Sequence, residues 1–338
     1  MKIKMVDVAR HLGISKATVS LAVHNKPGVN QETRQKVLDC IAQMEKNDGM
    51  IPESVSVSLQ NGQPLLIKVV ILNHQKKVVC DPELDLWSEV LATFDAQARK
   101  MGYLYGLTYV GEDEEEIANV IRECNLDLVA GVIVFGTEMD ETDREILSQI
   151  HKPIVLYDCD VPDGRYSSVC INNYGTVHKA LDYLRAHGAD QIRYFSTDKN
   201  IYNFRKRREA FQNDMISSGT IPEKSDFVAL GNTIPEITQN ALNWFQTHPL
   251  PDGILLENYQ VSIGTAVAVR KLGIRVPDQL KLIGIDEVPE YMASGIPFVQ
   301  MKIPHAERAQ IAMELLEKEI RGEWSARLKV FAESDLIE

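Results

Sequence analysis

The first residues whose types and spacing indicate a chemical role lie at the start of the chain, in the run VDVARHLGISKATVS over residues 6–20. Ala9 and Gly13 are four residues apart, so one helix can carry a small residue where a second helix packs closely, and the glycine can turn the chain between them. Ser15 is a good N-cap for the second helix. The first turn and a half of that helix then carries Lys16, Ala17, Thr18 and Ser20.

These four side chains suit contact with double-stranded DNA. Lys16 can donate to guanine O6 and N7 or to a phosphate, and Ala17 can touch a thymine methyl group. The hydroxyls of Thr18 and Ser20 suit phosphate oxygens, which set the register of a protein on DNA without reading its sequence. In a helix-turn-helix these are the positions that meet the duplex. An Ala-x-x-x-Gly spacing taken alone is also ordinary helix packing, and this alternative stays open at this point.

The distribution of charge supports a DNA-binding head. Residues 1–46 contain eight Lys or Arg and four Asp or Glu, a net charge of +4, while the whole chain has −12, which leaves −16 for the remainder. A small basic segment on an acidic body confines the attraction for phosphates to one end of the chain.

The sequence offers little for catalysis. It holds no G-x-S-x-G, G-x-x-x-x-G-K-[ST], G-x-G-x-x-G or H-E-x-x-H motif, and its 8 histidines lack metal-ligand spacing. We therefore expect no enzyme, no metal and no cofactor. The 5 cysteines are scattered, odd in number and form no C-x-x-C pair, which predicts reduced thiols in a cytoplasmic protein. No apolar run approaches the roughly 20 residues of a membrane span, and we expect no membrane partner.

The pattern of apolar residues predicts how the chain is organised. Three short helices are expected in the head, near residues 5–12, 15–24 and 31–46, followed by a polar, turn-rich linker. Strand-like apolar runs follow near 66–72, 104–110, 129–135, 153–157, 168–171, 191–195, 226–230, 253–256, 280–285 and 298–303. Amphipathic helical stretches lie near 87–101, 113–124, 141–149, 173–187, 204–217, 235–248, 260–273 and 305–321.

Alternating strands and helices indicate parallel sheets covered on both faces, and ten strands are too many for one small sheet. The predicted fold is a small all-α helix-turn-helix headpiece plus an α/β body of two doubly wound parallel-sheet lobes. We expect the head at 1–48, a linker or hinge at 49–64, and the body at 65–338. Within the body, the predicted N-lobe covers about 65–160 and 288–322, and the C-lobe covers about 161–287 and 323–338.

The run VDVARHLGISKATVS, followed by KPGVNQETRQKVL at residues 26–38, closely resembles the head of the lactose/galactose repressor family. The resemblance extends over nearly the whole chain. It implies a symmetric dimer whose two heads enter successive major grooves of a near-palindromic operator, and a body like the periplasmic sugar-binding proteins. Leu21 stands where the family commonly has an Arg, and Asn25 replaces the Gly that ends its Val-Leu-Asn-Gly. Asn25 completes the DNA-binding set that we expect.

Family linkers form a short hinge helix on DNA and wedge a Leu into the minor groove, which implies this role for Leu59. Of the family pattern Pro52 and Leu59 remain, while the Tyr, Asn and Arg are absent. Val55 and Leu59 are four apart and can share one helical face. The alternative is a flexible tether, because alternating Ser and Val favour a helix poorly.

The resemblance also implies a set of effector contacts in the body: Trp87, Asp158, Arg205, Asn258 and Asp286. An aromatic platform with carboxylates, an amide and an Arg suits a polyol or phosphosugar. Each has a structural alternative. Trp87 could be helix core, and Arg205 could form a surface ion pair. The other three could cap a turn or the helix that follows.

We therefore expect a cytoplasmic, homodimeric repressor that binds double-stranded operator DNA and regulates carbohydrate-utilisation genes in response to a small carbohydrate or phosphosugar effector. One alternative is control by a protein co-regulator. Another, from a different class, is a sugar-binding module without regulatory DNA binding.

Overall fold

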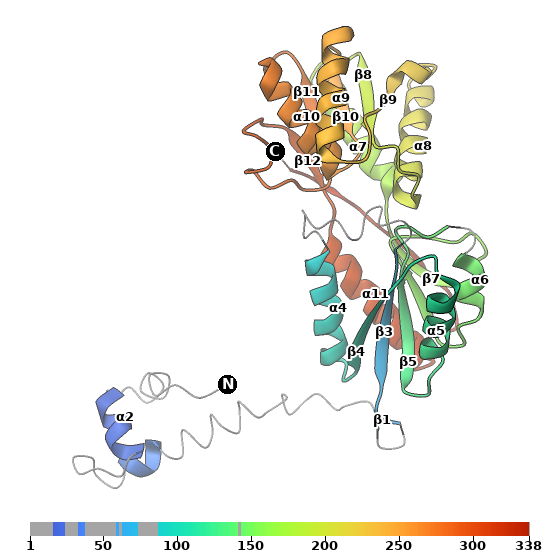
Figure 1. Ribbon diagram of the computed structural model, residues 1–338, viewed down its shortest axis with the longest axis vertical. Coiled ribbons are helices and arrows are strands. Elements are labelled where there is room, and N and C mark those ends of the chain that lie inside the picture. Colours follow the sequence, from blue (N-terminus) through green and yellow to red (C-terminus); the bar gives the residue numbers. More distant parts are fainter. Residues whose placement is uncertain are drawn as a thin grey trace. The chain divides into compact units, whose positions relative to one another are not determined.

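The computed structural model describes residues 16–23, 33–37, 59–60, 63–73, 87–140 and 143–337. The chain divides into a unit that contains residues 1–58 and a unit that contains nearly all of the chain from Leu59 onward. The second unit is the body, and it has two lobes, each built on a six-stranded sheet (Figure 1).

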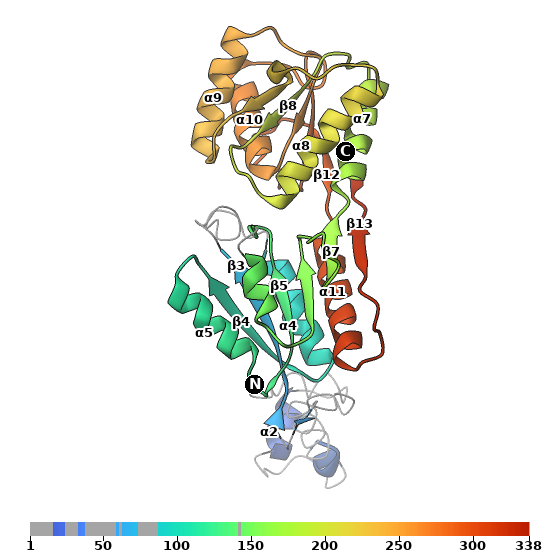
Figure 2. The same ribbon diagram turned by 90° about the vertical axis from the view of Figure 1, so that its right-hand side faces the viewer.

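The N-lobe sheet is parallel throughout and has the strand order β13-β7-β6-β5-β3-β4. Its strands are β3 (Leu66–Leu72), β4 (Leu104–Val110), β5 (Val129–Phe135), β6 (Ile154–Tyr157), β7 (Ser167–Ile171) and β13 (Lys329–Ala332). Its helices are α4 (Ser88–Lys100), α5 (Glu114–Cys124), α6 (Asp143–Ser148) and α11 (His305–Ile320). Helices α4 and α11 cover one face and α5 and α6 the other (Figures 1 and 2).

The C-lobe sheet has the order β14-β12-β11-β10-β8-β9, and only β14 runs antiparallel to its neighbour. Its strands are β8 (Ile192–Ser196), β9 (Phe227–Ala229), β10 (Gly253–Leu256), β11 (Lys281–Ile285), β12 (Val299–Lys302) and β14 (Asp335–Ile337). Its helices are α7 (Asn173–Ala186), α8 (Tyr202–Ser217), the short η2 (Lys224–Asp226), α9 (Ile234–Thr247) and α10 (Tyr259–Leu272).

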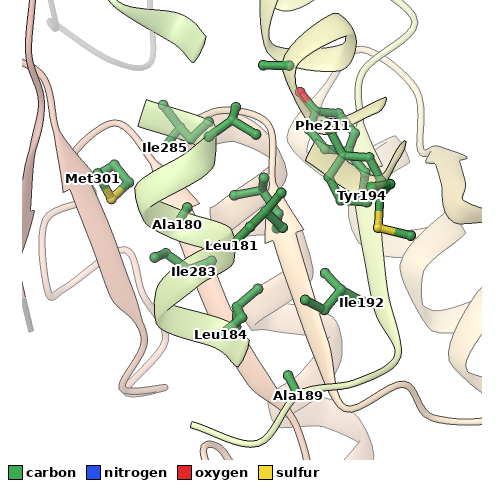
Figure 3. Close-up of a cluster of buried hydrophobic side chains, with 14 of the residues drawn as sticks. Ala180, Leu181, Leu184, Ala189, Ile192, Tyr194, Phe211, Ile283, Ile285 and Met301 are labelled. Atoms are coloured by element: carbon green, nitrogen blue, oxygen red, sulfur yellow. The ribbon is translucent and has the colours of Figure 1, made fainter. Parts of the chain in front are cut away.

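Continuous apolar runs form the central strands because both faces of each sheet are covered by helices. In the C-lobe, Leu181 and Leu184 of α7 pack over Ile192 and Ile283 of the sheet (Figure 3). On the opposite face α10 packs against α9 at Gly264, where a Cβ atom would lie 2.5 Å from Ile237 Cγ2. A residue with a side chain there would force these two helices apart.

The ten strands and eight helices predicted for the body all appear, but three predicted lobe boundaries were wrong. Strand β7 pairs with β6 in the N-lobe, β12 pairs with β11 in the C-lobe, and β13 returns to β7 in the N-lobe. The chain therefore crosses between lobes after Ile171, after Lys302 and after Ala332, rather than near 160, 287 and 322. An apolar run predicts a strand, but it does not indicate which sheet that strand joins.

The described end of the linker also differs from the expected helix. Leu59 lies in β1 (Leu59–Gln60), which pairs antiparallel with β2 (Gln63–Pro64). The intervening Asn61-Gly62 is a strong hairpin signal in the sequence. This structure thus has Leu59 in a strand, while a helix induced by operator DNA stays a prediction about the bound state. Within the described residues, no helix is long and apolar enough to span a bilayer.

Candidate functional site

Polar side chains from both lobes meet where the carboxyl ends of the strands face each other. Thr137 follows β5, Asp158 follows β6, Asn258 follows β10 and Asp286 follows β11. Ligands of open parallel sheets bind in such crevices. The cavity between these residues, hereafter the cleft, is lined by Trp87, Thr137, Asp158, Ile171, Ile201, Asn203, Phe204, Arg207, Asn258, Tyr259, Asp286 and His305.

The cleft is small. Its volume is about 30 Å³, which is space for little more than a water molecule. Pockets for drug-sized ligands measure about 300–1,000 Å³. As it stands, the cleft therefore has no room for a sugar-sized molecule.

Asp158 is the most heavily bonded carboxylate of the cleft. Its side chain accepts hydrogen bonds from the Thr137 hydroxyl (2.6 Å) and from Asn203 Nδ2 (2.8 Å), and it forms an ion pair with Arg308 of α11. Asp158 is 1% exposed and Arg308 is 0% exposed. The Arg308 guanidinium also lies over the Tyr157 ring, 4.7 Å from its centroid. Because Asn203 belongs to α8 of the C-lobe, its bond to Asp158 joins the two lobes.

The arginine that lines the cleft is Arg207, whereas the predicted Arg205 is not among the lining residues. Arg207 is buried, donating from Nε to Asn173 Oδ1 (3.0 Å) and from Nη1 to the Glu257 carbonyl (2.6 Å), and it lies 3.5 Å from the Asp286 carboxylate. Arg205 is exposed and donates to the Asn200 carbonyl at 3.4 Å. Two residues along a helix are about 200° apart, so the two arginines point to opposite sides.

The helical periodicity of α8 could have identified Arg207. The buried positions Asn203, Phe204, Arg207, Ala210 and Phe211 recur at three- and four-residue steps, and Arg207 is among them. An arginine on the buried side of an amphipathic helix indicates a polar cavity or an internal ion pair beneath it.

Asn258 and Asp286 line the cleft, as expected. Asn258 also caps the helix that follows it, which was the alternative role considered for this residue. Its Oδ1 accepts from the Val261 N–H (3.1 Å), which caps α10. Asp286 has a φ of +74° and Asp158 one of +65°, a region that costs energy for residues other than glycine. Strain of this kind at both lobes is typical of a binding cleft.

Trp87 and His305 are two of the aromatic residues of the lining, which also include Phe204 and Tyr259. The Trp87 ring meets Phe135 edge-on at 4.9 Å and His305 at 5.5 Å between centroids. Burial, and then the positive charge of Arg308, lower the pKa of His305, so its imidazole is held in the neutral form. The sequence alone did not point to His305, Thr137, Asn203 or Arg308, because each occurs in a stretch that otherwise reads as an ordinary helix or loop.

The thiols that the structure describes in the body are buried. Cys124, Cys159 and Cys170 are free, and burial raises the pKa of Cys124 to about 11 and that of Cys170 to about 12. These side chains are therefore inert protonated thiols at neutral pH. No group of three or more His, Cys, Asp or Glu side chains within the described segments is placed to hold a metal ion.

The described part of the head agrees with a second helix at the predicted position. Helix α2 spans Lys16–Val23, with Val19 and Ala22 buried and Thr18 half-buried. The side chains of Lys16, Ala17 and Ser20, and all of Ser15 and Asn25, lie outside the described residues.

A helix near the start of the chain and a two-lobed α/β body with a polar cleft are the arrangement that the resemblance to the repressor family predicts. The model for bacterial regulatory proteins of the lacI family matches residues 4–45, and the model for a periplasmic binding protein-like domain matches residues 181–337. Residues 4–45 thus match the lacI family and residues 181–337 a periplasmic binding protein-like domain, which is the combination that the resemblance predicted.

Similar proteins span the full length of the chain. The HTH-type transcriptional repressor PurR of Mannheimia succiniciproducens is 23% identical over 98% of this chain and 96% of its own length. The repressor CytR of Escherichia coli strain K12 is 22% identical over 94% and 90%. The transcriptional regulator CelR in complex with cellobiose has a TM-score of 0.69 at 18% identity, covering 100% of this chain and 99% of its own. The Lac repressor dimer bound to operator and the anti-inducer ONPF also has 0.69, at 19% identity over 100% and 98%.

Proposed function

We propose that this repressor acts in the cytoplasm as a homodimer, controls carbohydrate-utilisation genes, and responds to a small sugar-like effector bound in the cleft. The observation that carries the proposal is the convergence of Trp87, Asp158, Asn258 and Asp286, which come from four separate segments and from both lobes, on one cleft.

The charges of the cleft favour an uncharged, hydroxyl-rich effector over a phosphosugar. Asp158 is paired with Arg308, and Asp286 lies beside Arg207. The two acids and two bases balance, so no net positive charge is left for a phosphate. Carboxylates and an amide accept and donate to hydroxyl groups, and the Trp87 ring supplies an apolar surface for the face of a sugar. One structural neighbour, CelR, forms a complex with the sugar cellobiose, which supports an effector of this chemical class.

Control of operator binding follows from the size of the cleft. An effector that fits only an opened cleft binds one arrangement of the lobes better than the other, and this difference in affinity shifts the population between them. By linkage, the effector changes operator affinity by the same factor as operator changes effector affinity. Whether operator affinity rises or falls depends on which arrangement of the lobes binds operator better.

On the DNA, we assign the reading contacts to α2. Lys16 and Ala17 meet base edges, and Ser15, Thr18, Ser20 and Asn25 position the head on the backbone. Leu59 enters the minor groove if the linker folds into a helix on operator.

Selection of duplexes from a random pool by the full-length protein tests this function. We expect a near-palindromic site to be enriched, and a sugar from a metabolite panel to change its yield. Lys16→Ala should weaken binding to the selected site about tenfold or more, since a lost base or phosphate contact costs roughly 1–3 kcal/mol. Lys206→Ala, an exposed lysine of α8, is the matched control. Full affinity of the Lys16 variant would remove Lys16 from the reading set, and no enrichment would contradict the proposal.

A regulator controlled by a protein co-regulator is the second candidate. It is favoured by the polar groups of the cleft bonding to one another, with Asn203 linking the lobes through Asp158. Thermal-shift screening with sugars and phosphosugars separates the two candidates. A sugar that stabilises the wild type but not Asp286→Asn supports the cleft as effector site, with the exposed Asp278→Asn as control. A panel without any such sugar favours the co-regulator.

A further inference from the structure

A second cavity, separate from the cleft, lies between the lobes on the other side of α8. Its volume is about 480 Å³, within the range of about 300–1,000 Å³ that holds small-molecule ligands. The N-lobe contributes residues that follow β5 and β6, including Met139, Arg144 and Asp160. The C-lobe contributes Asn200, which precedes α8, and Tyr202 and Arg205 from the start of that helix.

The charged groups of this cavity differ in whether they are already neutralised. Both oxygens of Asp160 are held by Lys329 Nζ, at 2.7 and 2.8 Å. Asp140 and Arg144, which also line the wall, have partners within the chain. The Arg205 guanidinium, by contrast, donates only to the Asn200 carbonyl at 3.4 Å, and no carboxylate in the described part of the chain pairs with it. Among the described residues, Arg205 is thus an arginine of this cavity to which no carboxylate is paired.

An unpaired guanidinium is a ready donor to an oxyanion, because its planar fork of N–H groups matches two oxygens of a phosphate or carboxylate. The neighbouring lining suits the rest of a metabolite. Asn200 and Tyr202 are polar contacts, while Met139 and Val161 present apolar surface.

Helix α8 is a wall shared by this cavity and the cleft. Asn203 and Arg207, one turn apart, face the cleft, whereas Tyr202 and Arg205 face the second cavity. A ligand in the second cavity would touch both lobes and the helix that carries the Arg207 contacts of the cleft.

We propose that the second cavity binds a small metabolite through an oxyanion group held by Arg205, and that this ligand stabilises one arrangement of the lobes. By linkage, it changes the affinity of the cleft for its own ligand. This site is independent of the identity of the cleft effector.

Calorimetric titration of the full-length protein with inorganic phosphate tests the proposal, with acetate as a second arm and chloride holding the ionic strength constant. We expect saturable phosphate binding that Arg205→Gln weakens about tenfold or more, as loss of a charge-assisted hydrogen bond does. Lys206→Gln removes the same charge one residue away, from an exposed lysine paired with Glu209, and should leave the affinity unchanged. A response to acetate as well would identify the carboxylate as a sufficient group.

Hydrogen exchange locates the bound anion. Phosphate should slow exchange in peptides that contain Val161 of the N-lobe and Tyr202 of the C-lobe in the wild type, and not in Arg205→Gln. Phosphate bound at the basic head would be unaffected by the Arg205 substitution. The proposal is overturned if the wild type binds no phosphate, or if both glutamine variants bind it as the wild type does. Neither result bears on operator selection, so failure here leaves the proposed function standing.

Discussion

Asp158 and Asp286 occupy matching positions in the two lobes, yet their surroundings differ. Each directly follows a strand, each has a positive φ, and each lies beside an arginine from a helix. Asp158 is buried with Arg308 and accepts two further hydrogen bonds. Asp286 is 14% exposed, lies 3.5 Å from Arg207 and has no hydrogen-bond donor among the described residues. The N-lobe aspartate thus serves mainly the structure, whereas the C-lobe aspartate keeps acceptor capacity for a ligand.

The largest expected effect comes from removing the counter-ion of the buried aspartate. Arg308→Met leaves the Asp158 carboxylate without its charge partner, and breaking a buried ion pair in this way costs about 3–5 kcal/mol. The free energy of unfolding in urea measures the loss. Arg321→Met, at the exposed end of the same helix, should change it by less than ~0.5 kcal/mol. Similar losses of unfolding free energy for both variants would contradict the structural role assigned to the Asp158–Arg308 ion pair.

A smaller effect separates the two aspartates directly. Asp158→Asn keeps the shape but leaves Arg308 buried and uncompensated, so a loss of about 2–3 kcal/mol is expected. Asp286→Asn should cost less, about 1 kcal/mol, because Arg207 lies 3.5 Å from this carboxylate and keeps its hydrogen bonds to Asn173 and the Glu257 carbonyl, and because asparagine tolerates the positive φ. Urea unfolding of the two variants side by side provides the comparison, which would fail if Asp286→Asn were the more damaging.

The pH dependence of stability tests another group on the N-lobe side of the cleft, His305. The folded-state pKa of His305 is lowered, so the unfolded chain binds more protons there as pH falls through the ordinary histidine range. His305 therefore stabilises the fold least in acid, and its contribution to stability is lost as pH falls through the unfolded-state pKa near 6.5. His305→Gln should show a shallower fall in unfolding free energy between pH 7.5 and 5.5 than the wild type.

Much of the body could be predicted from the sequence because its signals are local. Runs such as LIKVVIL in β3 and VAGVIVF in β5 are apolar on both faces, and the amphipathic stretches between such runs are long. Strand pairing is not local, and this explains why the strands β7 and β12, and the segment 323–338 that contains β13, were assigned to the wrong lobes. Among the strands of the two lobes, β13 and β14 were not predicted; they are short and lie at sheet edges, where side chains are partly exposed.

The candidate site was predictable where a strand ends in a polar residue. Asp158, Asn258 and Asp286 follow apolar runs, and strand ends face the cleft by topology. Choosing Arg207 over Arg205 required knowing which face of α8 is buried. Aligning this segment with the arginine of the family does not establish that face. Arg308 gave no signal, because one arginine in the amphipathic helix α11 looks like any solvated residue until the helix is packed against β6.

The three crossings between lobes have a consequence for how the protein is made. The N-lobe begins with β3 but needs α11 and β13, which are synthesised after nearly the whole C-lobe. Until α11 has emerged, the face of β5, β6 and β7 that it covers stays exposed to water. The nascent N-lobe therefore cannot complete its core while the ribosome is still translating the C-lobe, and the two lobes must finish folding together at the end of synthesis.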